Sequence, residues 1–183
     1  MPFTVLTGVR RGTLADVAPV ARLAVDADRE ARRELPPLHD PAERGAPELA
    51  LQLLEDLNDG SLLYVAERDG RTTGYAQVTG LMVGDGGHLV EVRRVYVVPE
   101  HRRRGTGRRL LALVVRDLRH RPGPPALRAW APAGSDSARF LEAAGGSPVR
   151  QRWKVGHGGI AVKGVLFGWG PTETPAVRDH ALA

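Results

Sequence analysis

The chain has no cysteine among its 183 residues, which excludes disulfide bonds and thiolate metal sites. Aromatic residues are scarce, at 5%, and none is interleaved with the arginines as a nucleic-acid stacking surface requires. No apolar run approaches the roughly 20 residues of a membrane-spanning helix, and the first residues lack the apolar core of a signal peptide. We therefore expect a cytoplasmic protein that binds neither membranes nor nucleic acids.

The length and composition are typical of a single globular domain. Hydrophobic residues make up 42% of the chain and charged residues 26%. We expect the folded domain to span residues 1–170. Residues 171–183 are polar and contain prolines, so we expect a mobile tail there.

The net charge of +5 is distributed unevenly. Residues 101–121 contain eight arginines and one aspartate, whereas residues 26–60 contain ten acids and four arginines. A basic and an acidic region of this kind indicate two different ligands rather than one broad nucleic-acid surface.

Hydrophobic periodicity and turn residues predict an α/β chain with four helices and about seven strands. A helix separates the strands at 89–98 and 126–131, which predicts that these two strands are parallel. The remaining strand connections favour a mixed, mostly antiparallel sheet with helices on both faces. The other predicted strands are 5–11, 61–68, 72–81, 149–155 and 160–169. The first predicted helix starts after residues 13–16 and ends at about residue 33. The other predicted helices are 48–57, 107–120 and 138–144.

A short basic loop, residues 102–107, joins a strand to a helix and is the most informative stretch. The strand ends at Pro99, and the helix after the loop carries apolar residues at three- and four-residue spacing. This arrangement directs unpaired N–H groups and the positive end of the helix dipole toward an anion. Glycines that serve only the turn are the alternative, but the adjacent arginines favour a phosphate site.

Arg102, Gly105 and Gly107 match the pattern Arg or Gln, two residues, Gly, one residue, Gly or Ala. In this pattern the sequence resembles the GNAT superfamily of acyl-CoA-dependent N-acyltransferases. Residues 66–76 and 140–146 are similar to a strand hairpin and a late helix of that family. The resemblance implies a GNAT-like fold with a splayed parallel strand pair, and acetyl-CoA as the co-substrate.

The resemblance also implies which residues bind CoA. The backbone N–H groups of residues 103–108 would hold the pyrophosphate, and the main chain of Val95 and Val97 would pair with the pantetheine arm. Core packing is the alternative role for these two valines. The implied CoA-binding residues are Val95, Val97, Arg102, Arg103, Arg104, Gly105, Thr106, Gly107 and Arg108.

Acyl transfer requires a neutral amine, and a lysine-like amine has a pKa near 10.4, so a base must remove a proton. Glu91 lies eleven residues before Arg102, where some family members carry a catalytic glutamate. A salt bridge with Arg93 or Arg128 is the alternative role for Glu91. The N–H of Val97 is the implied donor to the thioester oxygen.

The general acid of the family is missing from its usual position. Family members commonly have tyrosine just after the residue that matches Phe140, and this chain has Leu141. Strand alternation predicts that Tyr96 lies on the opposite face from Glu91. The leaving thiolate would then depart unassisted or with help from water.

These observations predict an N-acetyltransferase that acetylates a primary amine, in a small molecule or a peptide. The amine would attack directly in a ternary complex, because no cysteine can carry the acetyl group. A catalytically silent acyl-CoA-binding or regulatory module is the alternative. The acids of the first two helices suggest a cationic acceptor or, equally, a solvated helix face. The histidine spacing predicts no metal site, and a homodimer is one option for the oligomeric state.

Overall fold

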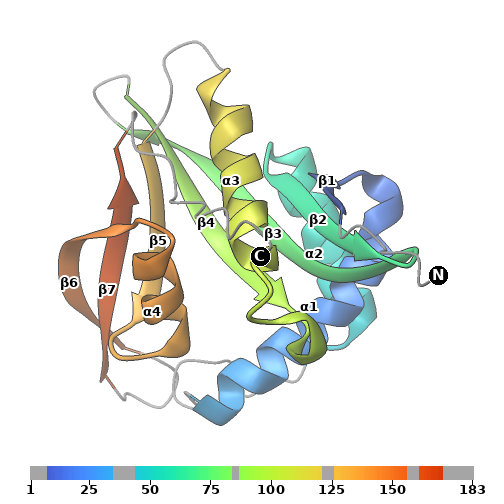
Figure 1. Cartoon of the computed structure of the whole chain (residues 1–183), viewed down its shortest axis with the longest axis horizontal. Coiled ribbons are helices and arrows are strands. Elements are labelled where there is room, and N and C mark those ends of the chain that lie inside the picture. The colour runs from blue at the N-terminus through green and yellow to red at the C-terminus, as the bar shows by residue number, and fades with distance from the viewer. Residues whose placement is uncertain (1–7, 35–43, 84–86, 121–125, 156–160, 171–183) are drawn as a thin grey trace, which may run out of the picture.

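Seven strands form one mixed sheet in the order β1-β2-β3-β4-β5-β7-β6 (Figure 1). This computed structural model describes residues 8–34, 44–83, 87–120, 126–155 and 161–170. β4 and β5 run parallel and the other neighbouring strands antiparallel, which confirms the predicted fold class. The strands are β1 (Gly8–Arg11), β2 (Leu62–Arg68), β3 (Arg71–Val83), β4 (Gly87–Val97), β5 (Ala126–Pro132), β6 (Ser147–Val155) and β7 (Ala161–Trp169).

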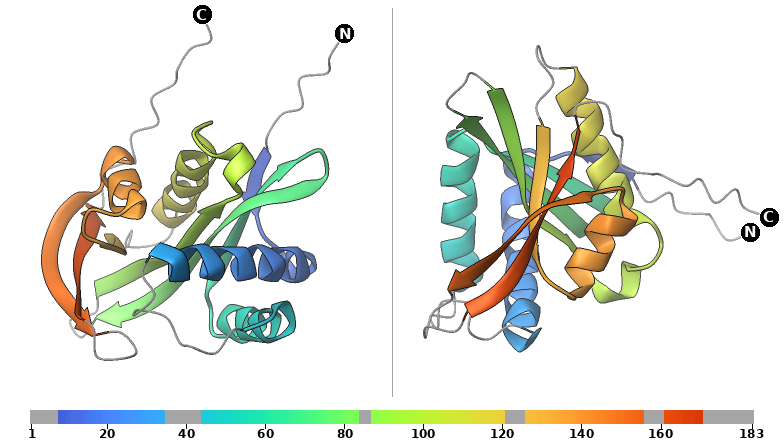
Figure 2. Two further views of the ribbon diagram at one scale, coloured as in Figure 1. Left: turned by 90° about the horizontal axis from the view of Figure 1, so that it is seen from below. Right: turned by 90° about the vertical axis from the view of Figure 1, so that its left-hand side faces the viewer.

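Helices cover both faces of the sheet, as predicted. α1 and α2 pack on one face, and α3 and α4 pack on the other (Figure 2). None of the helices in the described ranges is long and apolar enough to cross a membrane. The helices are α1 (Val17–Glu34), α2 (Ala46–Asn58), α3 (Thr106–Arg119) and α4 (Asp136–Ala143), with short 3-10 turns at Leu14–Asp16 and Pro99–His101.

Two hydrophobic clusters hold these layers together, one under each pair of helices. The apolar stripe predicted for α3 is confirmed, because all its members are buried against the sheet. In α1 Ala24 is buried, and Leu23 beside it is partly buried against the same cluster. The buried residues of the α3 stripe are Leu110, Leu111, Val114, Val115 and Leu118.

Asp69-Gly70, a pair of residues that favours hairpin turns, joins β2 to β3. Both residues have positive φ, 53° and 71°, which is the backbone of a tight turn between antiparallel strands. The strand predicted from residue 5 begins at Gly8 in the described part of the chain. Residues 5–7, the expected turn at 156–159 and the expected tail from 171 lie outside the described residues.

β4 contains a bulge at Arg93 that reverses which face its side chains occupy. Val92 is opposite Val78, whereas Arg94 is opposite Gln77, so Arg93 is an extra residue. Tyr96 consequently lies on the same face of the sheet as Glu91, toward α1 and α2. The prediction that these two side chains lie on opposite faces is wrong, because regular alternation does not continue through a bulge.

An ion-paired cluster fixes the start of α1. Thr13 and Asp16, which lie three positions apart, form a capping box, with the Thr13 N–H donating to Asp16 Oδ2 at 2.7 Å. Arg10 from β1 donates to both oxygens of Asp16, at 2.7 and 2.8 Å, and also binds Glu67. These bonds, with that to Arg10 the largest, lower the pKa of the buried Asp16 carboxyl to about 2.

We expect Asp16→Asn to lower the free energy of unfolding at pH 7 by about 2 kcal/mol. The folded-state pKa lies below the usual value, so the stabilisation is present above pH 4 or so and is lost as the pH falls through about 2. Urea unfolding at pH 7 and pH 3 measures it. Asp26→Asn is the control, because Asp26 is exposed and its contact with Arg29 is 3.9 Å long. Equal stability of the two variants would contradict this account.

Candidate functional site

The parallel strands β4 and β5 separate along their length and leave a gap in the sheet. They pair only where Leu89–Val92 lies beside Ala126–Ala129, and both strands continue beyond that point (Figure 1). Backbone groups that face such a gap have no ladder partner and need one. The gap is therefore a place where an extended ligand can complete the sheet.

Val95 and Val97 turn their main-chain groups toward this gap. The Val98 N–H donates to the Thr73 carbonyl at 3.0 Å, so Val98 and Thr73 form a hydrogen-bonded pair between β4 and β3. Hydrogen-bonded and non-hydrogen-bonded pairs alternate along antiparallel strands. Val95 and Val97 therefore direct their N–H and C=O groups away from β3. The side chains of both valines pack against the core, which is the alternative role considered from the sequence, and their main chain is a candidate for pairing with a ligand.

The loop before α3 presents several N–H groups without partners. Arg103 and Gly105 have positive φ, 60° and 80°, and this backbone leads directly into the first turn of the helix. Within the described residues, the first main-chain hydrogen bond of α3 runs from the Arg109 N–H to the Gly105 carbonyl, and residues 103–108 donate to no protein acceptor. Arg103 and Arg104 are exposed beside these donors. The loop can bind an anion through its main chain.

The two glycines of the loop have different roles. A Cβ at Gly105 would meet nothing within 4 Å, so this glycine faces open space where a ligand can approach. A Cβ at Gly107 would lie 3.0 Å from the ring of Phe140 on α4. Gly107 therefore allows α3 and α4 to pack closely, and a bulky residue there would disturb the fold as well as the loop.

The side chain of Arg102 is exposed but is fixed by contacts within the protein. Its Nε donates to the Val97 carbonyl at 2.7 Å, and Nη2 binds Glu30 of α1 at 2.5 Å. Its guanidinium also lies over the ring of Tyr96, 5.4 Å from the centroid. The Arg102 side chain thus ties the end of β4 to α1, and anion binding is left to the N–H groups that follow it.

Tyr96 completes this contact on the face that carries α1. Its hydroxyl donates to Glu30 Oε1 at 3.1 Å. Burial, followed by the Glu30 carboxylate, raises the pKa of Tyr96 to about 12. Glu30 was not distinguished from the other acids of α1 in the sequence, because its partners lie 66 and 72 positions away.

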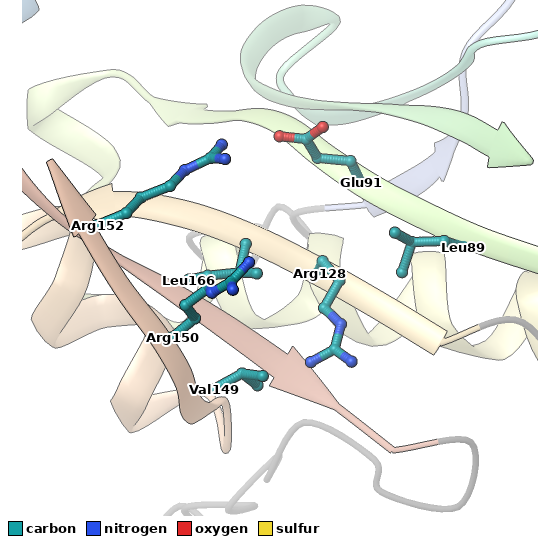
Figure 3. Close-up of a pocket in the computed structure, with 7 residues that line it drawn as sticks. All are labelled: Leu89, Glu91, Arg128, Val149, Arg150, Arg152 and Leu166. Carbon is teal, nitrogen blue, oxygen red and sulfur yellow. The ribbon is translucent and has the colours of Figure 1, made fainter. Parts of the chain in front are cut away.

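Glu91 lies on the same face of the sheet and lines an open pocket of about 410 Å³ (Figure 3). It stands one residue before the point where β4 and β5 separate. Among the described residues it forms no ion pair with Arg93 or Arg128, and Arg93 instead contacts Asp56 at 3.5 Å. The carboxylate is therefore available to a ligand. The pocket is lined by Leu89, Glu91, Arg128, Val149, Arg150, Arg152 and Leu166.

The late helix, α4, has no proton donor at position 141. Leu141 is 5% exposed and belongs to the core beneath α4. Ser135 caps α4, accepting from the Ala138 N–H at 3.1 Å and donating to the Pro132 carbonyl at 2.8 Å. The serine hydroxyl is thus occupied by the helix cap.

Two acids of α1 are bound by the chain's own arginines. Asp28 is buried and forms ion pairs with Arg94 at 2.9 Å and with Arg44 at 3.4 Å. Glu30 is bound by Arg102. These contacts hold α1 against β4, so neither acid is free to recognise a cationic acceptor.

Comparison with known proteins gives one family and several similar structures. The model of the acetyltransferase (GNAT) family matches residues 25–145. A comparison with curated proteins finds no match. A ribosomal-protein-alanine N-acetyltransferase from Brucella melitensis is 25% identical, with a TM-score of 0.72 over 88% of this chain and 98% of the other.

Two further similar structures contain acetyl-CoA. The protein yncA from Salmonella typhimurium, solved with its cofactor acetyl-CoA, is 22% identical, with a TM-score of 0.71 over 93% of this chain and 98% of the other. A phosphinothricin acetyltransferase from Sinorhizobium meliloti, in complex with acetyl-CoA, is 20% identical, with a TM-score of 0.70 over 96% of each chain.

Proposed function

Because the chain belongs to the acetyltransferase (GNAT) family, we propose that it transfers the acetyl group of acetyl-CoA to a primary amine. The proposal is carried by two groups of unpaired main-chain atoms that follow one another along β4 and the loop after it. The main chain of Val95 and the N–H of Val97 face the gap between β4 and β5, and the free N–H groups of residues 103–108 lie at the end of the same strand.

These features fit the parts of a CoA molecule. The N–H groups at the start of α3 and the exposed Arg103 and Arg104 suit a pyrophosphate. The main chain in the gap suits the amide-containing pantetheine arm, and the open space at Gly105 lets the ligand approach the backbone. When bound, acetyl-CoA supplies the thioester that is the acetyl donor.

The positions of Glu91 and the valines favour one location for the reaction. On β3, Thr79 is opposite Glu91, Ala76 is opposite Val95 and Gly74 is opposite Val97. At about 3.3 Å per residue, Val95 is roughly 10 Å along the sheet from Glu91 and Val97 roughly 17 Å. An amine within reach of the Glu91 carboxylate is therefore closer to the Val95 N–H than to the Val97 N–H. We assign the role of donor to the acetyl oxygen to Val95, in place of Val97, which the family resemblance implied.

In the proposed reaction the acceptor nitrogen forms an amide bond as the carbon–sulfur bond breaks. Glu91 takes the proton that the ammonium group must lose. The sulfur leaves as a thiolate and takes a proton from water, because Leu141 is buried in the core, Ser135 caps α4 and the Tyr96 hydroxyl donates to Glu30. Direct transfer in a ternary complex agrees with the absence of cysteine from the chain.

Two measurements on the full chain test this function. Calorimetry with acetyl-CoA is expected to show one site per chain, and a thiol-release assay with a panel of amines is expected to show acceptor-dependent turnover. The buried Leu141 favours the alternative of a silent acyl-CoA-binding module. Binding without release for every amine would support that alternative, and absence of acetyl-CoA binding would contradict both functions.

A further inference from the structure

The pocket beside Glu91 is rich in arginine. Three of its seven lining residues are arginines, Arg128 from β5 and Arg150 and Arg152 from β6, and Glu91 is the one acid (Figure 3). In Figure 3 the Glu91 carboxylate and the Arg152 guanidinium extend toward each other from opposite sides of the pocket. The pocket therefore has an excess of positive charge next to the candidate base.

No carboxylate of the described residues lies within 4 Å of these three guanidinium groups. Other arginines on this face of the sheet are paired, Arg93 with Asp56, Arg94 with Asp28 and Arg102 with Glu30. Three acids of α1 and α2, Asp28, Glu30 and Asp56, are thus bound to arginines of β4 and of the loop after it. The arginines of β5 and β6 remain available to a ligand.

Arg128 is positioned by the strand beside it. It is opposite Gly168 on β7, and a Cβ at that glycine would lie 2.3 Å from Arg128 Nη1. The guanidinium therefore lies over Gly168 of β7, in space that a larger residue would fill. An arginine held in this way loses less side-chain entropy when it binds an anion than a freely moving one does.

The arginine pocket is separate from the expected phosphate site of CoA. It opens on the face that carries α1 and α2, next to the paired first half of β4. The loop at residues 103–108 follows the other end of β4 and leads into α3, on the opposite face. The three arginines are thus placed for the acceptor rather than for CoA.

We propose that the acceptor is a small amine that also carries an anionic group, a carboxylate or a phosphate. Arg128, Arg150 and Arg152 bind the anion, and the ammonium group points toward Glu91. Guanidinium groups suit this task because they form paired hydrogen bonds with carboxylate and phosphate oxygens. A volume of about 410 Å³ suits a small molecule. This proposal rests on the acetyl-transfer function given above.

Matched acceptor pairs test the proposal in the thiol-release assay. L-methionine is compared with L-methioninamide for the carboxylate, and phosphoethanolamine with ethanolamine for the phosphate. Spermidine represents a cationic acceptor. Wild-type protein is expected to give a kcat/KM at least about tenfold higher for the better of the two anionic acceptors than for its neutral counterpart.

Variants separate anion binding from the intrinsic reactivity of each amine. Arg128→Gln and Arg152→Gln are expected to raise KM about tenfold for the preferred anionic acceptor, with less than about twofold change for its neutral counterpart. Arg71→Gln is the matched control, because Arg71 is exposed at the β2–β3 hairpin. It is expected to leave both values unchanged. Circular dichroism establishes that each variant is folded.

The outcomes distinguish this inference from the function on which it rests. The anionic acceptor would be overturned if turnover were faster with spermidine or the neutral amines. It would also be overturned if the arginine variants changed KM equally for both members of a pair. Either result would leave the acetyl-transfer function intact. Failure of acetyl-CoA to bind in calorimetry would overturn acetyl transfer itself, and the acceptor with it.

Discussion

Glu91→Gln is expected to lower kcat for amine acetylation by about 100-fold or more at pH 7. Glutamine preserves the shape of the side chain but cannot accept the proton of an ammonium group. The defect is expected to shrink as the pH approaches 10, because a lysine-like acceptor then loses its proton to the solvent. Measured kcat profiles from pH 6 to pH 10 test this, with acetyl-CoA saturating.

The charges around Glu91 also predict how Glu91→Gln affects the KM for the acceptor. Removal of the negative charge beside Arg128 and Arg152 strengthens the attraction for the anionic group of the acceptor but removes the carboxylate that faces its ammonium group. We therefore expect KM to change by less than about threefold while kcat falls. Glu55→Gln on the exposed side of α2 is the control and is expected to resemble wild type. A Glu91→Gln profile parallel to that of wild type at every pH would assign Glu91 a structural role.

Most of the fold could be predicted from local patterns in the sequence. The apolar stripe of α3, the capping box at Thr13 and the turn at Asp69-Gly70 each depend on a few neighbouring residues. The parallel pairing of β4 and β5 followed from the helix between them. Such features are encoded within one element or one connection, so they need no knowledge of the rest of the chain.

The bulge in β4 was missed although the sequence contains a signal for it. Buried or core-facing valines occur at even positions 90 and 92 and then at odd positions 95 and 97. This change of parity across Arg93-Arg94 marks an inserted residue in a strand that otherwise alternates. Recognition of the shift would have placed Tyr96 and Glu91 on the same face.

The candidate site was predictable in its backbone but not in its charge pairing. The loop at residues 102–107 follows a local pattern, whereas the contacts of Arg102 with Glu30 and of Arg94 with Asp28 join residues 72 and 66 positions apart. The acids of α1 suggested a cationic acceptor because the sequence does not reveal which of them are already paired. The unpaired arginines of β5 and β6 point to the opposite charge for the acceptor.

Gly105→Glu is expected to weaken CoA binding by about 100-fold. Gly105 has φ of 80° and a Cβ there meets no protein atom, so the added side chain extends into the space where the ligand approaches. A carboxylate about 5 Å from a phosphate opposes binding by roughly 3 kcal/mol at an effective dielectric constant of 20. The same carboxylate is compatible with the first turn of α3, because negative charge is favourable at a helix N-terminus. Calorimetric titration with CoA measures the loss.

Gly60→Glu is the matched control for the backbone strain of this substitution. Gly60 follows α2, has φ of 89° and likewise has open space where a Cβ would lie, so both variants carry a similar cost of roughly 1–2 kcal/mol for an L-residue at positive φ. CoA at about ten times the wild-type Kd is expected to raise the Tm of wild type and of Gly60→Glu and to leave that of Gly105→Glu nearly unchanged. If Gly105→Glu bound CoA as tightly as Gly60→Glu, the N–H groups at the start of α3 would not be the phosphate site, and the CoA route along β4 would have to be abandoned.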